Sequence, residues 1–96
     1  MPEHLYIVVY DISDPKRWRK VFKVMNGYGA WVQLSVFQCR MSRQRQAELL
    51  ARLDGLIDHR EDHVVLVDVG VADNVEPRVV SLGKPFHVMR REPVIV

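Results

Sequence analysis

The sequence predicts one α+β domain, a βαββαβ sandwich in which two helices cover one face of a mainly antiparallel sheet. Three observations favour this class. The chain has 96 residues, which gives room for one hydrophobic core and not for two. Its composition, 48% hydrophobic and 27% charged, is that of an ordinary globular protein. Strand-like and helix-like patterns alternate along it in the order strand, helix, strand or strand pair, helix, strand.

The first predicted strand, residues 5–11 (LYIVVYD), is the element around which the rest is expected to be arranged. Its apolar run leaves neither face polar, so we expect a central strand buried on both faces. Asp11 ends this run, where the chain leaves the sheet. A carboxylate held there is suited to bind a hard cation. It is equally suited to cap the turn that follows, and the residue type leaves both roles open.

A helix is predicted to begin at Pro15, with Asp14 as its N-cap. Residues 26–29 (NGYG) are expected to end it, because glycine readily adopts the positive φ found at many helix ends. Apolar residues at helical spacing form one stripe that would pack on the sheet: Trp18, Val21, Phe22, Met25 and Tyr28.

Residues 30–41 are strand-like throughout, as one bent strand or as two strands that meet near Ser35. Ser42 is expected to cap a second helix, from about residue 43 to 57. The apolar stripe of this helix is predicted to be Ala47, Leu50, Leu53 and Ile57, with Leu49 and Leu56 on a neighbouring line.

The C-terminal third begins with a predicted strand, residues 63–69, and a short strand is expected at residues 78–82. The core of the domain is expected within residues 5–82. The apolar tail, residues 93–96, is expected to add as a strand to a sheet edge. The sheet face away from the helices still has apolar side chains to bury, and a second copy of the chain is the simplest cover.

Basic residues are concentrated in one part of the chain. The formal net charge is only +2, but residues 15–47 contain no Asp or Glu, and all 12 acidic residues lie outside them. Such a basic face suits a polyanion, most commonly a nucleic acid. The alternative is a solvated helix face whose counter-charges come from elsewhere in the fold. The candidate nucleic-acid-binding residues are Lys16, Arg17, Arg19, Lys20, Lys23, Arg40 and Arg43.

Several other classes are disfavoured. No apolar stretch approaches the roughly 20 residues needed to cross a bilayer, and residues 1–4 do not have the pattern of a signal peptide. Cys39, the single cysteine, fits a reducing cytosol and a packing role. No phosphate-binding glycine loop or paired-cysteine zinc pattern is present. His59 and His63 are interpreted as surface histidines, and Asp68 as a turn residue.

One carboxylate makes a poor metal site, because a divalent cation in water requires several oxygen ligands. A two-fold symmetric dimer changes this, since the same patch then faces itself and Asp11 can meet Asp11 of the other copy. A Mg²⁺ held between them is suited to polarise a phosphoryl oxygen or activate water for phosphodiester hydrolysis. We treat this shared site as a hypothesis.

Three segments in series resemble a known family: residues 10–14 (YDISD), the basic helix 16–23 (KRWRKVFK) and residues 28–37 (YGAWVQLSVF). Over residues 5–82 the chain is similar to the small CRISPR-associated adaptation protein, the partner of the spacer integrase, often called the CRISPR-associated endoribonuclease. The resemblance implies a ferredoxin-like fold and a homodimer that exchanges its C-terminal strands.

The resemblance also implies a role for Asp11. It matches the family's metal-binding, catalytic aspartate, one from each subunit, with Mg²⁺ or Mn²⁺ as the shared cofactor. It implies a prokaryotic, cytoplasmic protein that partners the CRISPR integrase. Some members are nucleases on RNA or double-stranded DNA, and others bridge two integrase dimers without cleavage. Arg17 and Arg19 match bases expected to contact phosphates, whereas Gln38 stands where many relatives carry Glu.

Overall fold

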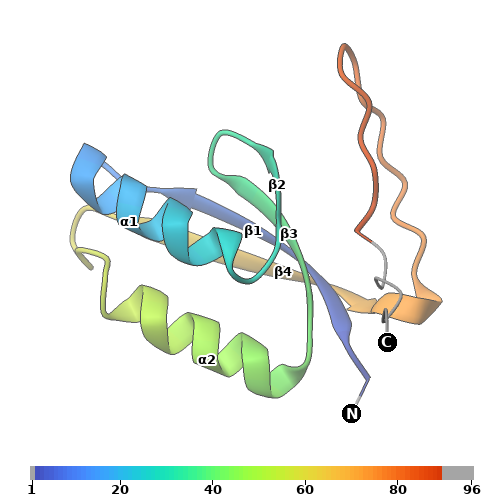
Figure 1. The fold of residues 1–96 in the computed structure, drawn as a ribbon, viewed down its shortest axis with the longest axis horizontal. Coiled ribbons are helices and arrows are strands. Elements are labelled where there is room, and N and C mark those ends of the chain that lie inside the picture. The colour runs from blue at the N-terminus through green and yellow to red at the C-terminus, as the bar shows by residue number, and fades with distance from the viewer. Residues whose placement is uncertain (1, 90–96) are drawn as a thin grey trace, which may run out of the picture.

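The computed structural model describes residues 2–89, and its elements follow the predicted order (Figure 1). They are β1 (His4–Asp11), α1 (Pro15–Asn26), β2 (Ala30–Gln33), β3 (Val36–Met41), α2 (Arg43–Asp54), β4 (His63–Val71) and the short 3-10 helix η1 (Ala72–Asn74). The strands form one antiparallel sheet in the order β2-β3-β1-β4. This arrangement confirms the predicted βαββαβ sandwich, and it is ferredoxin-like.

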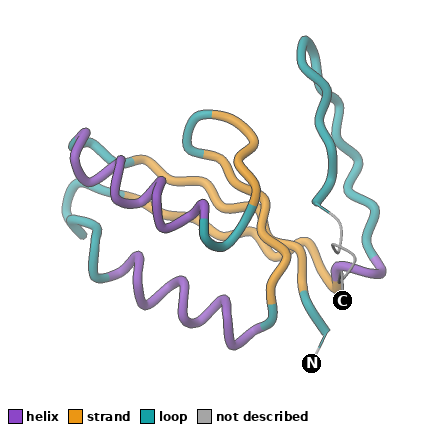
Figure 2. The backbone as a smooth tube through the Cα atoms, in the orientation of Figure 1, coloured by secondary structure: helices purple, strands orange, loops and turns teal. Residues whose placement is uncertain are grey.

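Both helices lie on the same face of the sheet (Figures 1 and 2). The core fills the space between the two layers, and alternate residues of β1 and β3 supply its sheet side. Its most deeply buried members are Val8, Val21, Met25, Phe37, Cys39, Met41, Leu49 and Leu53. Cys39 is therefore a packing residue, as expected, and burial raises the pKa of its thiol to about 11.

The opposite sheet face has an apolar, partly uncovered region toward the Asp11 end of β1. Val9 of β1 lies between Val36 of β3 and Val65 of β4. We call this region the open face; it comprises Ile7, Val9, Val36, Val65 and Val67. Val9, Val65 and Val67 are 41%, 40% and 49% exposed. The expectation that β1 is buried on both faces is therefore wrong for a single chain, because the helices cover only one face.

The start of α1 is as predicted, with the side chain of Asp14 accepting a hydrogen bond from the Arg17 amide at 2.9 Å. The helix ends at Asn26, but the expected reason is wrong, because Gly27 has a φ of −81°. Close packing instead requires glycine at position 29. A Cβ on Gly29 would overlap the carbonyl oxygen of Gln38 and lie 2.5 Å from Cys39 Sγ.

Residues 30–41 are two strands, which answers the question that the sequence left open. The turn between them is at Leu34, whose φ is 40°, and at Ser35. Trp18 Nε1 donates to Ser35 Oγ at 2.8 Å, and the Tyr10 amide donates to the Ser35 carbonyl at 3.1 Å. Side-chain and backbone hydrogen bonds thus hold this turn against α1 and β1.

Helix α2 is capped as predicted, since Ser42 Oγ accepts from the Arg45 amide at 3.2 Å. It ends at Asp54, three residues earlier than expected. The predicted apolar stripe is partly wrong, because Leu50 is 41% exposed, whereas Leu49 and Leu53 are buried. Leu53 and Ile57 of the predicted stripe contact the core together with Leu49 and Leu56 of the neighbouring line.

Beyond β4 the chain makes an extended excursion, residues 75–89, which we call the arm (Figures 1 and 2). The short strand expected at residues 78–82 is wrong, because this part of the arm has no strand partner within residues 2–89, and Val80 and Leu82 are 92% and 93% exposed. The predicted C-terminal strand, residues 93–96, lies outside the described residues. In the described part of the chain, no helix has the length and apolar character to cross a membrane.

Candidate functional site

Asp11 is the last residue of β1 and pairs with His63, the first residue of β4. Because side chains alternate along a strand, Asp11 lies on the open face with Ile7 and Val9. Its side chain is exposed and takes no part in the hydrogen bonds within residues 2–89. Capping of the following turn falls to Asp14 and Asp62 instead. The Asp11 carboxylate is therefore available to a ligand.

Asp62 fixes the loop that follows Asp11. Its side chain is 0% exposed, and its oxygens accept from the backbone amides of Ser13 at 3.1 Å and Asp58 at 2.8 Å. Arg17 donates from Nε to Asp62 Oδ2 at 2.8 Å and from Nη2 to Oδ1 at 3.2 Å. The hydrogen bond from Arg17 is the main cause that lowers the pKa of Asp62. The carboxylate is thus ionised and fully engaged at neutral pH.

The residues at this edge fit a hard cation only in part. Residues 2–89 contain no group of three or more His, Cys, Asp and Glu side chains arranged to hold a metal ion. Asp62 and Glu61 are engaged by Arg17, which leaves Asp11 as the available oxygen donor. Mg²⁺ or Mn²⁺ accepts such a carboxylate, but one donor group per chain is half of a protein site at most.

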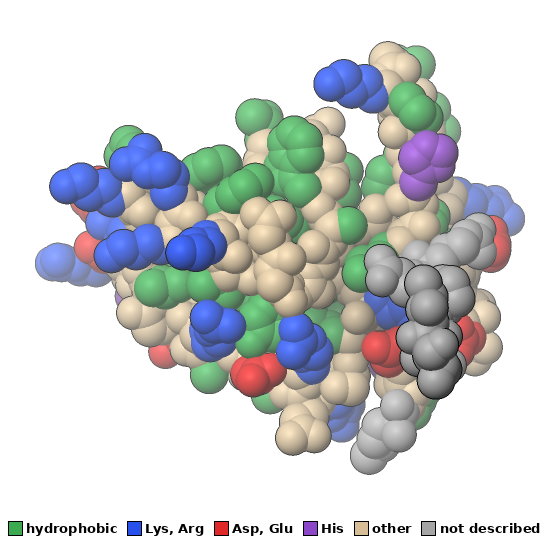
Figure 3. Space-filling model, viewed as in Figure 1, with side chains coloured by type: hydrophobic (Ala, Val, Ile, Leu, Met, Phe, Trp, Pro, Cys, Tyr) green, Lys and Arg blue, Asp and Glu red, His purple; other side chains and the backbone are tan. Residues whose placement is uncertain are grey.

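The candidate nucleic-acid-binding residues divide into two groups. Figure 3 shows Lys and Arg side chains spread over the layer of the two helices. Five of them are exposed and form no ion pair within the described chain: Lys16, Arg19, Lys20, Lys23 and Arg43. Arg17 and Arg40 pair with carboxylates from outside residues 15–47, so their counter-charges do come from elsewhere in the fold.

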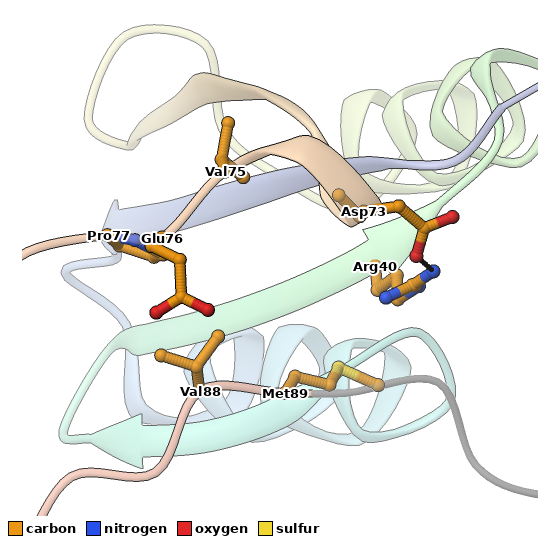
Figure 4. A pocket seen from close by; sticks show the side chains of 8 residues that line it. Arg40, Asp73, Val75, Glu76, Pro77, Val88 and Met89 are labelled. Carbon is orange, nitrogen blue, oxygen red and sulfur yellow. Dashed lines mark hydrogen bonds and ion pairs between the residues drawn. The ribbon is translucent and has the colours of Figure 1, made fainter.

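Arg40 lies away from this layer, beneath the arm. Its guanidinium pairs with Glu3, 2.9 Å from Nε to Oε1, and with Asp73, and its side chain is 9% exposed. A cavity of about 230 Å³ beside it is lined by residues of η1 and the arm. In Figure 4, Asp73 and Val75 lie on one side of this cavity, and Val88 and Met89 lie on the other. In this arrangement Arg40 joins the N-terminus, η1 and β3.

The remaining candidates are structural. His59 Nε2 is 3.1 Å from the Asp54 carbonyl and 3.2 Å from Asp54 Oδ1, which agrees with its interpretation as a surface histidine. Asp68 lies within β4, where it accepts from the Gly70 amide at 2.9 Å and from His4 Nδ1 at 2.9 Å. The expectation of a turn at Asp68 is wrong, because β4 continues past it to Val71; its bond with Gly70 lies where the pairing of β1 with β4 shifts register.

Sequence reasoning missed two sets of contacts. The first is the engagement of Arg17 by Asp62, which are 45 residues apart. The second is the bond pair of Gln38 with the arm, in which Nε2 donates to the His87 carbonyl at 2.8 Å and Oε1 accepts from the Met89 amide at 2.6 Å. The only sequence signal was that Gln38 differs from the Glu of many relatives.

Fold and site together define a class: a small ferredoxin-like domain with one available carboxylate at the end of its central strand, beside a cationic helix layer. The family model described as CRISPR associated protein Cas2 matches residues 4–75. The chain belongs to this family.

Relatives extend the similarity over nearly the whole chain. The CRISPR-associated endoribonuclease Cas2 1 of Rhodospirillum rubrum is 53% identical over 98% of this chain and 92% of its own length. The CRISPR-associated endoribonuclease Cas2 of Geobacter sulfurreducens is 52% identical over 98% of this chain and 99% of its own length. The crystal structure of Streptococcus pyogenes Cas2 superposes with a TM-score of 0.66 at 30% identity, covering 78% of this chain and 99% of that one.

Proposed function

We propose that this chain acts in CRISPR spacer acquisition as a homodimeric, metal-dependent endonuclease on RNA or double-stranded DNA, in association with the CRISPR integrase. The observation that carries the proposal is the exposed carboxylate of Asp11 at the end of β1, which has no hydrogen-bond partner within residues 2–89. The names of the relatives as endoribonucleases support the reaction class.

The open face supports the homodimer. An apolar sheet face with Val9, Val65 and Val67 each 40% or more exposed is costly to leave in water. Two-fold symmetry covers such a face with its own copy. Asp11 lies at the end of this face, so face-to-face pairing carries it toward Asp11 of the second copy. Two close carboxylates repel, and a cation between them removes the repulsion.

The chemistry follows from these residues. When bound, Mg²⁺ or Mn²⁺ supplies a Lewis acid for a phosphoryl oxygen and lowers the pKa of water. Asp11 of each subunit holds the ion through a carboxylate oxygen. The exposed bases of α1, with Arg43, bind backbone phosphates and fix the position of the strand without reading its sequence.

The test is cleavage of labelled duplex DNA and single-stranded RNA by the full chain in Mg²⁺, in Mn²⁺ and in chelator. Asp11→Asn removes the charge with little change in shape, and Asp54→Asn, at an exposed position on α2, is the matched control. We expect metal-dependent cutting that Asp11→Asn abolishes and Asp54→Asn retains. Cutting that survives Asp11→Asn would remove this residue from the site.

The oligomeric state tests the proposed homodimer and its shared Asp11 site. Val67→Glu puts a charge on the open face, where Val67 is 49% exposed in one chain. We expect it to convert a dimer into a monomer in sedimentation experiments and to abolish cleavage although Asp11 is intact. A wild-type monomer at micromolar concentration that cleaves at full rate would contradict the shared site.

A second candidate function is a non-catalytic DNA-binding dimer that bridges integrase dimers. The exposed cations of α1 favour it, because they suit duplex binding whether or not cleavage follows. For this function Asp11→Asn leaves spacer acquisition unchanged. Arg19→Glu with Lys20→Glu weakens binding to unrelated duplexes alike, and the slope of log affinity against log salt falls by about one unit for each phosphate that is no longer neutralised.

A further inference from the structure

We propose that Arg17 and Asp62 are positioning residues for Asp11, and that Arg17 serves this role rather than contacting phosphates. The inference rests on the proposed function of Asp11 as a metal ligand. It concerns the direction in which the Asp11 carboxylate points, which no hydrogen bond of its own side chain within residues 2–89 determines.

The chain around Asp11 is held from two sides. On one side, Asp11 pairs with His63 across the β1–β4 ladder. On the other, Ser13, two residues after Asp11, donates its backbone amide to Asp62 at 3.1 Å. Asp62 immediately precedes His63, so one short segment of the α2–β4 loop fixes both the end of β1 and the turn that leaves it. With its backbone fixed in this way, the Cα–Cβ bond of Asp11 points in one direction, which sets the position from which its carboxylate reaches a ligand.

Asp62 can do this only while Arg17 compensates its charge. A carboxylate with a side chain that is 0% exposed is stable when its oxygens are satisfied, and here two bonds from Arg17 add to those from the amides of Ser13 and Asp58. The side-on pairing by Nε and Nη2 also sets the angle between α1 and the loop, because a guanidinium bonds a carboxylate in a fixed plane. Arg17 thus connects the first turn of α1 to the loop beside Asp11.

The same contacts disfavour Arg17 as a phosphate ligand. Its Nη2 also lies 3.3 Å from Glu61 Oε2 and 3.3 Å from Ser13 Oγ. A phosphate that drew this guanidinium away would leave the buried charge of Asp62 uncompensated, which is far more costly than breaking a surface ion pair. Arg19, two residues on, is exposed and forms no ion pair within the described chain, so it provides a matched comparison on the same helix.

The experiment compares Arg17→Lys and Arg17→Ala with Arg19→Lys and Arg19→Ala in the full-length protein. Lysine keeps the positive charge but has a single nitrogen, so it cannot reproduce the side-on pair. Two readouts are needed: Mn²⁺ affinity by calorimetry, which does not depend on cleavage, and duplex affinity as a function of salt. We expect Arg17→Lys to weaken Mn²⁺ binding by about 10- to 100-fold, the usual cost of losing a group that orients a ligand.

The two roles predict opposite patterns in these readouts. We expect Arg17→Ala to leave the salt slope of duplex binding unchanged, Arg19→Lys to alter neither quantity, and Arg19→Ala to reduce the salt slope by about one unit. Unchanged Mn²⁺ affinity in folded Arg17→Lys would overturn the inference. A reduced salt slope in Arg17→Ala, equal to that of Arg19→Ala, would also overturn it.

Asp11→Asn distinguishes a failure of this inference from a failure of the proposed function. If Asp11→Asn leaves Mn²⁺ affinity unchanged, the proposed metal site itself is wrong. If Asp11→Asn abolishes Mn²⁺ binding and Arg17→Lys does not weaken it, only the positioning role is wrong. The double variant Asp62→Asn with Arg17→Lys adds a further check. If the two residues act through one interaction, the double variant should bind Mn²⁺ no more weakly than the single variant with the lower affinity.

Discussion

Gln38 is expected to hold the arm against the sheet through its side-chain amide. It is 5% exposed and lies on β3 between Phe37 and Cys39, both of which face the core, so its side chain lies on the opposite side of the sheet. Its bonds to the His87 carbonyl and the Met89 amide, at 2.8 and 2.6 Å, imitate the pair that a neighbouring strand would make. The side chain of Gln38 thereby attaches residues 87–89 of the arm to the face of the sheet, without a backbone ladder.

Gln38→Ala removes both bonds and leaves the backbone of the arm otherwise unchanged. At about 0.5–1.5 kcal/mol for each bond, the loss is about 1–3 kcal/mol, which corresponds to a 5- to 150-fold shift toward the detached arm. Hydrogen exchange of the Met89 amide measures this shift directly, as a fall in protection by the same factor. Gln33→Ala is the control, because Gln33 is exposed and its side chain makes no hydrogen bond within residues 2–89.

Gln38→Glu adds a test of the chemistry. An ionised Glu still accepts from the Met89 amide but repels the His87 carbonyl, so protection at neutral pH should fall further than in Gln38→Ala. As the pH falls through the carboxyl pKa, the protonated group donates again, and protection should recover. Equal protection of Met89 in the wild type and in Gln38→Ala would refute the reasoning, because the arm would then be held by other contacts.

Three further predictions concern single buried positions. Gly29→Ala should lower the free energy of unfolding by about 1–3 kcal/mol, since its methyl group would meet the Gln38 carbonyl and Cys39 Sγ; an unchanged melting temperature would contradict this. Tyr10→Phe should leave stability unchanged or raise it by up to about 1 kcal/mol, or about 4–8 °C in Tm, because the buried Tyr10 hydroxyl has no partner within residues 2–89; a fall of that size would reveal a hidden bond. Cys39 should resist Ellman's reagent at pH 8 in the folded chain and react in denaturant, because its pKa of about 11 and its burial both withhold the thiolate; rapid native reaction would be the contrary result.

The elements that local chemistry specifies could be predicted. Asp14 before Pro15, and Ser42 before α2, cap their helices as the residue types indicate. The turn at Leu34 could not be chosen over a bent strand, because Trp18 and Tyr10 hold it from distant parts of the chain. The buried face of α2 was misjudged at Leu50, because leucines lie on two neighbouring lines and only packing against the sheet shows which of them are covered.

The strands show a second limit of sequence reasoning. An apolar run indicates that a face is to be covered, but not by which chain. Ile7 and Val9 gave the pattern of a doubly buried strand, and within one chain the second face is open. Residues 78–82 also have an apolar strand pattern, but the described part of the chain provides no neighbouring strand for them.

The candidate site was predictable only where it depends on position along one strand. The apolar run 5–11 predicts that Asp11 is the last residue of a strand, and β1 does end at Asp11. The role of Arg17 did not follow, because its partner Asp62 lies in the polar loop 58–62, which has no periodic pattern and no local link to α1. The charge segregation grouped the basic residues but did not distinguish those, Arg17 and Arg40, that pair with carboxylates in the fold.

The carboxylates near the end of β1 explain why the proposed site requires two chains. Asp14 caps α1, Asp62 is enclosed by amides and Arg17, and Glu61 also pairs with Arg17. Within residues 2–89, Asp11 alone is unengaged there, so the oxygen donors that a hard cation requires must come in part from outside this part of the chain. Burial of the open face, which ends at Asp11, favours association with a second copy of the chain. That copy brings an identical carboxylate. Burying that face without a cation would leave two like charges at its edge, and dimer formation and metal binding are therefore expected to strengthen each other.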